Sequence, residues 1–195
     1  RPFYSEALRI FEEGIADKAT IDWVVRDTGG FKMGPFELMD LIGNDVNYAV
    51  STSVFEAFGY EPRYRPFLSQ KRLVEAGRLG RKTGQGHFDY RPGAAPPEPT
   101  KTKEAAAAVF PRIMAVLINA AVDGLFWRVA SRDDIDLAMV KGVNYPKGLL
   151  RWADDIGPAV VLERLDRLHA EYGEDRYRAS VLLRRMVATG ERFYS

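Results

Sequence analysis

Apolar residues recur at helical spacing along most of the chain. In the first segment, Phe3, Ala7, Leu8 and Phe11 share one face of a helix, and three glutamates fall elsewhere. Capping residues, prolines and glycines then delimit further helices over about 17–30, 35–43, 45–59 and 66–77. No alternation typical of a strand extends over a useful length. The pattern therefore predicts an all-α fold.

The same order of elements is repeated in the second half of the chain. A Ser131-x-x-Asp134 pattern predicts a helix start, and Pro158 opens a helix that should end at Gly173. Matching residues recur at a constant offset of 114 (157 − 43), which is hard to obtain by chance. Ala7, Ile21, Asp22, Gly34, Asp40, Gly43 and Gly59 recur as Ala121, Ile135, Asp136, Gly148, Asp154, Gly157 and Gly173.

A Pro- and Ala-rich stretch, Arg91–Thr102, separates the two halves and has no apolar period. Helical character resumes at about Glu104, where Pro111 either kinks the helix or begins its main body. We assign residues 1–90 to a first repeat of about five helices, 91–107 to a linker and 108–195 to a second repeat. Two small copies packed face to face would bury more apolar surface than either alone, so we expect a pseudo-two-fold relation between them.

Composition excludes or disfavours several classes of function and adds little about the fold. The net charge of +1 disfavours nucleic acid or an anionic membrane surface as a partner. The absence of cysteine excludes disulfides, Cys-based zinc sites and thiol catalysis, and it fits a cytoplasmic protein. No apolar run approaches the roughly 20 residues that span a bilayer.

Candidate catalytic groups are few. His87 is expected in a loop beside Phe88 and His169 on a helix surface, neither with a second metal ligand at suitable spacing. The basic loop around Arg81 and Lys82 lacks the glycine that precedes lysine in a Walker motif, and it follows a helix rather than a strand. We interpret this loop as a structural turn, and leave open a phosphate contact through either cation.

Other polar and aromatic positions favour structural roles. Asp40 and Asp154 lie near the C-terminal ends of matching helices, where an acid opposes the helix dipole, so each should have a fixed hydrogen-bonding partner. Trp23, Trp127 and Trp152 are predicted to be core or interface residues rather than a cofactor box. No G-x-G-x-x-G follows a predicted strand, so the sequence contains no dinucleotide-binding half. We predict no catalytic, cofactor-binding or metal-binding residue in this chain.

Two long motifs together resemble the C-terminal domain of 3-hydroxyacyl-CoA dehydrogenases. The first is Gly30–Gly43 (GFKMGPFELMDLIG), and the second is Leu73–Gly86 followed by His87-Phe88-Asp89-Tyr90. The second half resembles the degenerate tandem version of this domain, in Asn144-Tyr145-Pro146-Lys147-Gly148, Trp152–Gly157 and Arg176-Tyr177-Arg178. The resemblance implies a fold like the C-terminal domain of 6-phosphogluconate dehydrogenase.

The resemblance also implies an activity: oxidation of the 3-hydroxyl of an acyl-CoA with NAD. In that family a preceding Rossmann domain binds NAD and supplies the catalytic His/Glu pair, and an Asn that holds the substrate would lie just upstream of Arg1. The chain starts at Arg1 rather than Met, and the helical pattern is already present by Phe3. We therefore expect a segment of a longer chain that is inactive alone, the alternative for this start being a processed N-terminus. A non-catalytic helical scaffold or dimerisation module is the alternative.

Matching the motif to the family places Met33, Gly34, Pro35 and Leu38 at the acyl-CoA cleft, with a role in packing alone equally open. Lys32 stands where many members have proline. A cation there would pair with the far carboxylate of a dicarboxylic acyl chain, the alternative being a side chain in solvent. The two-copy form resembles enzymes of phenylacetate breakdown, which implies 3-hydroxyadipyl-CoA as substrate, with 3-hydroxybutyryl-CoA also open. The family's pairing through this domain implies a homodimer, or a monomer if the second copy replaces the partner.

Overall fold

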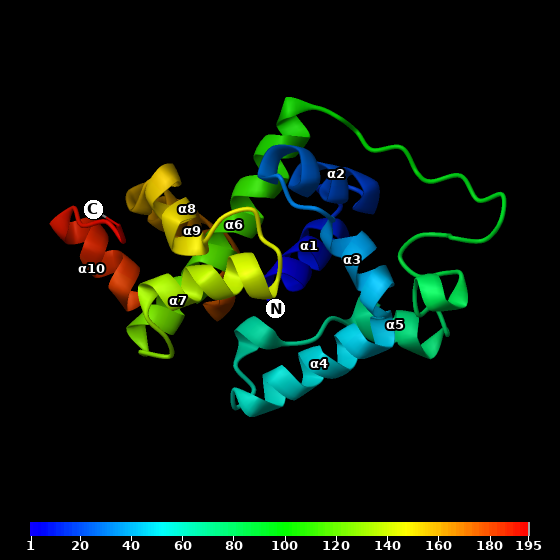
Figure 1. Cartoon of the computed structure of the whole chain (residues 1–195), viewed down its shortest axis with the longest axis horizontal. Coiled ribbons are helices and arrows are strands. Elements are labelled where there is room, and N and C mark those ends of the chain that lie inside the picture. Colours follow the sequence, from blue (N-terminus) through cyan, green and yellow to red (C-terminus); the bar gives the residue numbers. More distant parts are fainter. Residues whose placement is uncertain (195) are drawn as a thin grey trace. The chain divides into compact units, whose positions relative to one another are not determined.

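A computed structural model describes residues 1–194, and these are mostly helical apart from the long segment between η2 (Arg81–Thr83) and α6 (Lys103–Phe126) (Figure 1). Ten α-helices account for most of this range, and its only β-structure is two isolated bridges, Gly80 with Gln85 and Gln85 with Asp89. The all-α prediction is confirmed. Two compact units divide the chain, one from Arg1 to Phe110 and one from Pro111 to the C-terminus.

Unit 1 is built around the packing of α3 against its sequence neighbours. Helix α3 contacts α1, α2 and α4, and α4 packs along α5 (Figure 1). Fully buried Leu8, Ile21, Phe36 and Met39 form its core. The elements are α1 (Pro2–Glu12), α2 (Lys18–Gly29), α3 (Pro35–Ile42), α4 (Asn44–Ala57), η1 (Pro62–Tyr64), α5 (Leu68–Glu75) and η2 (Arg81–Thr83).

Unit 2 begins with the part of α6 (Lys103–Phe126) from Pro111 onward and repeats this order with one addition and without a counterpart of η2. Helix α8 contacts α7 and α9, and α10 packs on α9. A π-helical turn, Ala138–Gly142, extends α7, and the sequence pattern gave no sign of it. The elements are α7 (Arg132–Leu137), η3 (Ala138–Gly142), α8 (Leu149–Ile156), α9 (Pro158–Tyr172), η4 (Asp175–Tyr177) and α10 (Val181–Thr189).

The predicted helix starts are confirmed by their capping bonds. The side chain of Asp17 accepts a hydrogen bond from the backbone N–H of Thr20 at 2.8 Å. Ser131 does the same for Asp134 at 3.2 Å. Such bonds satisfy N–H groups that have no partner within the helix.

Helix α6 (Lys103–Phe126) begins where the sequence predicted that helix resumes, at about Glu104. It continues through Pro111, and by length and composition alone it could cross a membrane, because an 18-residue window within it has mean hydropathy 1.8. The expectation of no such run was wrong, because Arg112 and Asp123 interrupt the apolar sequence without interrupting the helix. Of its most apolar window 61% is buried inside the structure, as in the core helix of a folded protein.

For Trp127, predicted to be a core or an interface residue, only the interface alternative is left. Its side chain is 71% exposed, so it is not a core residue, whereas Trp23 and Trp152 are half-buried. The reason is its position just beyond the end of α6, where Arg128 turns the chain with a positive φ of 55°. The Trp127 ring packs edge-on against Phe126, with centroids 4.9 Å apart.

The linker is tied to unit 1 although it has no regular structure over residues 94–102. The backbone N–H of Thr100 donates a hydrogen bond to the hydroxyl of Thr20 in α2 at 2.8 Å. Pro96, Pro97 and Pro99 line a pocket against α2 and the start of α3. This segment therefore covers part of unit 1 rather than only joining the repeats.

Candidate functional site

The start of α3 is capped by a side chain from α2. Gly34 occupies the N-cap position but has no side chain to bond the first N–H groups. The side chain of Asp22 takes the capping role and accepts hydrogen bonds from the backbone N–H groups of Phe36 at 2.9 Å and of Glu37 at 2.8 Å. A Cβ on Gly34 would lie only 2.3 Å from the Cβ of Asp22. Glycine is therefore required here by close packing.

Asp22 is a buried acid with an unusual protonation equilibrium. Burial raises its pKa to about 7, although the two backbone N–H groups and Arg26 act in the opposite direction. It lies beside a pocket of about 230 Å³ that Phe88 also lines. The sequence contained one signal of this role, the paired recurrence of Asp22 and Gly34 as Asp136 and Gly148, but the pairing alone did not reveal it.

Asp40, at the C-terminal end of α3, organises the loop after α5. Its carboxylate accepts from the backbone N–H of His87 at 2.8 Å and of Phe88 at 2.9 Å. The side-chain amide of Asn44 donates to it at 2.9 Å, and the hydroxyl of Tyr90 at 3.1 Å. These bonds confirm that this acid has fixed partners, which offset its unfavourable place in the helix dipole. Burial and then Asp40 raise the pKa of Tyr90.

Two glycines let the loop approach Asp40 closely. A Cβ on Gly80 would lie 2.3 Å from the carbonyl oxygen of Asp40, and one on Gly86 would lie 2.0 Å from its Oδ1. Gly80 also has a φ of 99°, which favours glycine. The glycine spacing that resembles a phosphate loop therefore serves to wrap the backbone around a buried carboxylate.

The cations of this loop are held by acids of unit 1. Arg81 forms an ion pair with Glu37 of α3 at 2.9 Å, and Lys82 with Asp45 of α4 at 2.6 Å. Lys82 lowers the pKa of Asp45. The interpretation of the loop as a structural turn is confirmed, and both cations already have anionic partners. The phosphate contact that was left open has no support in this arrangement.

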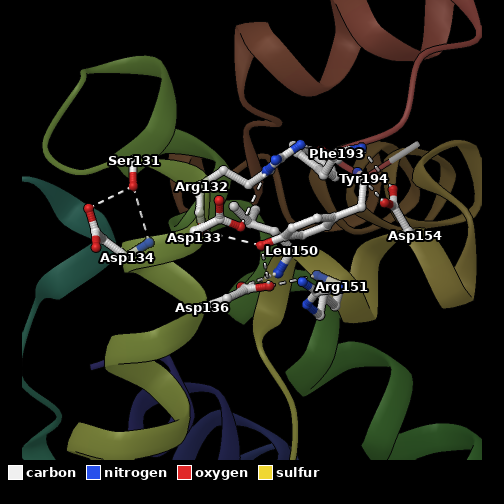
Figure 2. A network of polar contacts seen from close by, with 10 residues as sticks. All are labelled: Ser131, Arg132, Asp133, Asp134, Asp136, Leu150, Arg151, Asp154, Phe193 and Tyr194. Carbon is white, nitrogen blue, oxygen red and sulfur yellow. Dashed lines mark hydrogen bonds and ion pairs between the residues drawn. The ribbon is translucent and has the colours of Figure 1, made fainter.

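Unit 2 contains the same pair of carboxylates (Figure 2). Asp136 accepts from the backbone N–H of Leu150 at 2.8 Å and of Arg151 at 3.0 Å, at the start of α8. A Cβ on Gly148 would lie 2.2 Å from the Cγ of Asp136. The cap of α3 by Asp22 is thus repeated, residue for residue, at an offset of 114.

The second carboxylate of unit 2 holds the end of the chain. Asp154 accepts from the backbone N–H of Phe193 at 3.0 Å and of Tyr194 at 2.7 Å, as Figure 2 shows. The expected fixed partner of Asp154 is confirmed. The hydroxyl of Tyr194 reaches across to Asp136 at 3.0 Å, and burial followed by this bond raises its pKa to about 12. The two carboxylates of this unit are therefore linked by one tyrosine.

The five predicted cleft residues lie together at the start of α3. Gly34 and Pro35 are buried, Met33 and Leu38 are half-buried, and Lys32 is exposed. Among residues 1–194, Lys32 forms no hydrogen bond or ion pair. Their grouping on one turn follows from sequence adjacency, and their contact with substrate stays a prediction.

Exposed apolar side chains continue from this turn along α3 and α4. Leu41 and Ile42 are 50% and 40% exposed, and Val46 and Val50 are 45% and 42% exposed. We call these four residues, with Leu38, the apolar strip. Isolated exposed apolar residues are common on proteins, but four of them, with half-buried Leu38, on two consecutive helices favour a surface that another group covers.

The two histidines differ in environment. His169 is exposed, as predicted. His87 is only 9% exposed, and its ring packs edge-on against Phe36 rather than beside Phe88, with centroids 4.9 Å apart. No cluster of three or more His, Cys, Asp or Glu that could hold a metal occurs within residues 1–194. The site thus offers a rigid frame and an apolar surface.

Comparison with known proteins identifies this architecture. The family model for the 3-hydroxyacyl-CoA dehydrogenase C-terminal domain matches residues 1–90 and 109–192. The 3-hydroxyadipyl-CoA dehydrogenase of Escherichia coli is 35% identical over 94% of this chain and 57% of its own length. Human mitochondrial hydroxyacyl-coenzyme A dehydrogenase is 36% identical over 46% of this chain and 29% of its own length.

A solved structure agrees. The crystal structure of 3-hydroxybutyryl-CoA dehydrogenase from Escherichia coli superimposes with a TM-score of 0.88 and 32% identity, over 97% of this chain and 58% of that one. The chain therefore spans less than two thirds of the relatives that it matches over nearly its whole length. On these grounds the chain belongs to the 3-hydroxyacyl-CoA dehydrogenase family and carries its C-terminal domain in two matching segments.

Proposed function

We propose that this chain forms one wall of the acyl-CoA cleft in an NAD-dependent 3-hydroxyacyl-CoA dehydrogenase, which converts a 3-hydroxyacyl-CoA to a 3-oxoacyl-CoA. The observation that carries the proposal is the exposed apolar strip, which begins at Leu38, one of the predicted cleft residues. An acyl chain is apolar, and burying it against such a surface is favourable by roughly 25 cal/mol per Å². Family membership supports the reaction class.

A charge on the strip tests this role. In the full-length enzyme, Leu41→Asp should raise KM for the acyl-CoA about tenfold, because the acyl chain would contact a solvated charge. The second repeat has Asp155 at the matching position of α8, so an acid there is compatible with the fold. Val160→Asp, at an exposed apolar position of unit 2, is the control. Equal effects of the two variants on KM would contradict the proposal.

In the proposed reaction a hydride passes to NAD⁺ and the hydroxyl proton to a base. The resemblance assigns both the cofactor site and the His/Glu pair to a dinucleotide-binding domain, and none of this chain's residues to either. We expect no NADH production by the 195-residue chain alone, and production by the polypeptide extended upstream through such a domain. NAD-dependent oxidation by the chain alone would refute this division of labour.

The upstream sequence separates the enzyme from the alternative of a scaffold. A strand followed by G-x-G-x-x-G, and later a His/Glu pair, encoded before Arg1 would support the dehydrogenase. An unrelated domain in that position would support a non-catalytic module.

We further propose a dicarboxylic substrate, 3-hydroxyadipyl-CoA, as in phenylacetate breakdown. Lys32 is exposed and unpaired among residues 1–194, so its ammonium is available to the far carboxylate of an adipyl chain. In the full-length enzyme Lys32→Pro should impair turnover of the adipyl substrate more than that of the butyryl substrate. Equal impairment of both substrates would remove the idea.

Location and assembly complete the proposal. We propose a cytoplasmic enzyme, supported by the lack of cysteine, and contact between helical domains in a homodimer. Light scattering of the full-length enzyme distinguishes the dimer from a monomer in which the second repeat replaces a partner.

A further inference from the structure

A pocket of unit 1 lies away from the predicted cleft residues. It has a volume of about 320 Å³ and is formed by α1, the start of α2, α5 and the loop after α5. Leu8, Phe11 and Leu73 give it apolar walls. Pockets of small-molecule size commonly combine such walls with a few polar groups that fix the orientation of a ligand.

Three cations border this pocket without an anionic partner. Lys18, Arg72 and Arg78 all line it, and within residues 1–194 none of their side chains forms an ion pair. Burial lowers the pKa of Lys18, Asp40 acts against this, and Arg78 lowers it further. Like charges gathered beside an apolar cavity produce a positive potential that attracts anions.

The contrast with the neighbouring cations of the same loop is informative. Arg81 and Lys82 both reach acids, whereas Arg78, a few residues earlier, does not. The Nζ of Lys18 lies over the ring of Phe11, 4.7 Å from its centroid, so part of its charge is met by an aromatic face. The pocket therefore retains unneutralised positive charge at its border.

Unsatisfied hydrogen-bonding groups lie in the same pocket. Both ring nitrogens of His87 are buried without a partner, and so is the Oγ of Ser69. Buried polar atoms nearly always have a partner, and these two residues, which line the same cavity, have groups that could hydrogen-bond a ligand there. Burial, followed by the charge of Lys18, lowers the pKa of His87 to about 3. At neutral pH its ring is therefore uncharged and has one N–H donor.

We propose that this pocket binds a short-chain monocarboxylate. Its carboxylate faces Lys18, Arg72 and Arg78 and accepts hydrogen bonds from His87 and Ser69. Its alkyl tail packs on Leu8, Phe11 and Leu73. An inorganic anion would match the cations but not the apolar walls, and an alcohol would match the walls but not the cations. Because none of the five candidate cleft residues lines the pocket, this proposal stands or fails separately from the proposed dehydrogenase role.

Hexanoate is a suitable probe, and the two histidines provide the readout. We expect hexanoate to bind the 195-residue chain by calorimetry with a Kd on the order of 1 mM, a reasonable value for so few atoms. Its titration should move the ring ¹⁵N signals of His87 and leave those of exposed His169 in place. Inorganic phosphate and 1-hexanol should each bind at least about tenfold more weakly. No binding of hexanoate, or equal binding of either control compound, would overturn the proposal.

Neighbouring residues of α5 provide a matched pair of variants. Arg72→Gln removes an exposed cation that borders the pocket, and should weaken hexanoate about three- to fivefold. Lys71→Gln removes a cation that instead pairs with Glu75 at 3.5 Å, and should leave the affinity unchanged. His87→Phe keeps an aromatic ring and loses the donor, so it should weaken binding by a similar factor. Equal affinities of the Arg72 and Lys71 variants would refute a site at this pocket.

Discussion

The two repeats have matching buried carboxylates, but the residues that donate backbone hydrogen bonds to them carry different side chains. In unit 1, Asp40 receives the backbone N–H groups of His87 and Phe88, and in unit 2 Asp154 receives those of Phe193 and Tyr194. The first pair follows Gly77 by ten residues (87 − 77) and the second follows Gly190 by three (193 − 190). The bond pattern thus survives loss of the whole basic loop, because it uses only backbone donors.

The side chains at these positions then set different chemistry. Tyr194 donates its hydroxyl to Asp136, whereas Phe88 has none to offer Asp22, whose pKa is about 7. His87 brings unpaired ring nitrogens to a pocket, whereas Phe193 is a buried hydrocarbon ring. The backbone hydrogen bonds to the buried carboxylates are therefore the same in both repeats. The side chains at these positions differ, and in unit 1 His87 and Phe88 each line a pocket.

The surfaces of the two repeats also differ at matching positions. Leu41 of the apolar strip corresponds to Asp155, and Met33 to Lys147, at the offset of 114. In unit 2, Lys147 and Asp155 form an ion pair on the surface. At these two positions an apolar side chain of the first repeat is replaced by a charged one in the second, which supports a substrate-facing role for the first.

The largest effect should come from breaking the shared cap in both repeats. Gly34→Ala and Gly148→Ala each place a methyl group within about 2.3 Å of a buried aspartate, and should each lower the free energy of unfolding by about 3 kcal/mol. Chemical denaturation measures both. Gly142→Ala, where a Cβ meets nothing within 4 Å, is the control. A small effect of either glycine variant would show that the two caps are not equivalent.

A dependence of stability on pH should distinguish the repeats next. The pKa of His87 is lowered from 6.5 to about 3 in the folded chain. Between pH 6.5 and 3, His87 is therefore protonated in the unfolded chain but not in the folded chain. This group therefore reduces stability as pH falls from 6.5 towards 3, by about 2 kcal/mol at pH 5. Hydrogen exchange of unit 1 amides at pH 7.5 and 5 measures the loss.

His87→Phe, which copies Phe193 of unit 2, provides the comparison for this prediction. The difference in stability between the two pH values should shrink by about the same 2 kcal/mol in the variant. His169→Phe, at an exposed position, should leave the difference unchanged. If both variants behave like the unmodified chain, His87 is not buried in its neutral form.

Neutralising the capping acids should cost more in unit 2 than in unit 1. An asparagine has one acceptor oxygen, so one backbone N–H loses its partner, at about 1–2 kcal/mol. Asp136→Asn also disturbs the bond from Tyr194, and we expect it to cost about 1 kcal/mol more than Asp22→Asn. Urea denaturation at neutral pH measures the two losses. The reverse order would mean that the tyrosine link contributes nothing.

The smallest effect should follow from giving unit 1 the missing hydroxyl. Phe88 lines the pocket beside Asp22, so Phe88→Tyr should donate a hydrogen bond to that carboxylate. The pKa of Asp22 should fall below about 7, with a gain in stability of about 0.5–1 kcal/mol. Carboxyl ¹³C NMR titration measures the pKa. Tyr194→Phe is the reciprocal control, and an unchanged pKa in Phe88→Tyr would contradict the equivalence of the two positions.

Much of this fold was readable from local patterns. The helices from Pro2, Asp17, Pro35 and Pro158 were predicted because periodicity, caps and terminating glycines act within a few residues. The need of Asp40 for a fixed partner followed from its place in a helix dipole. The partner itself did not, because His87 lies 47 residues away and bonds through its backbone, which carries no mark in the sequence.

Spacing along the chain was therefore enough to predict the helical class, the repeat and the need of Asp40 and Asp154 for fixed partners. The tertiary structure decided which acid caps which helix, where α6 continues through Pro111, and that Trp127 is exposed. It also brought Lys18, Ser69 and His87 to one pocket. Such contacts depend on close packing between distant segments, and one methyl group at Gly34 or Gly86 would be enough to prevent it.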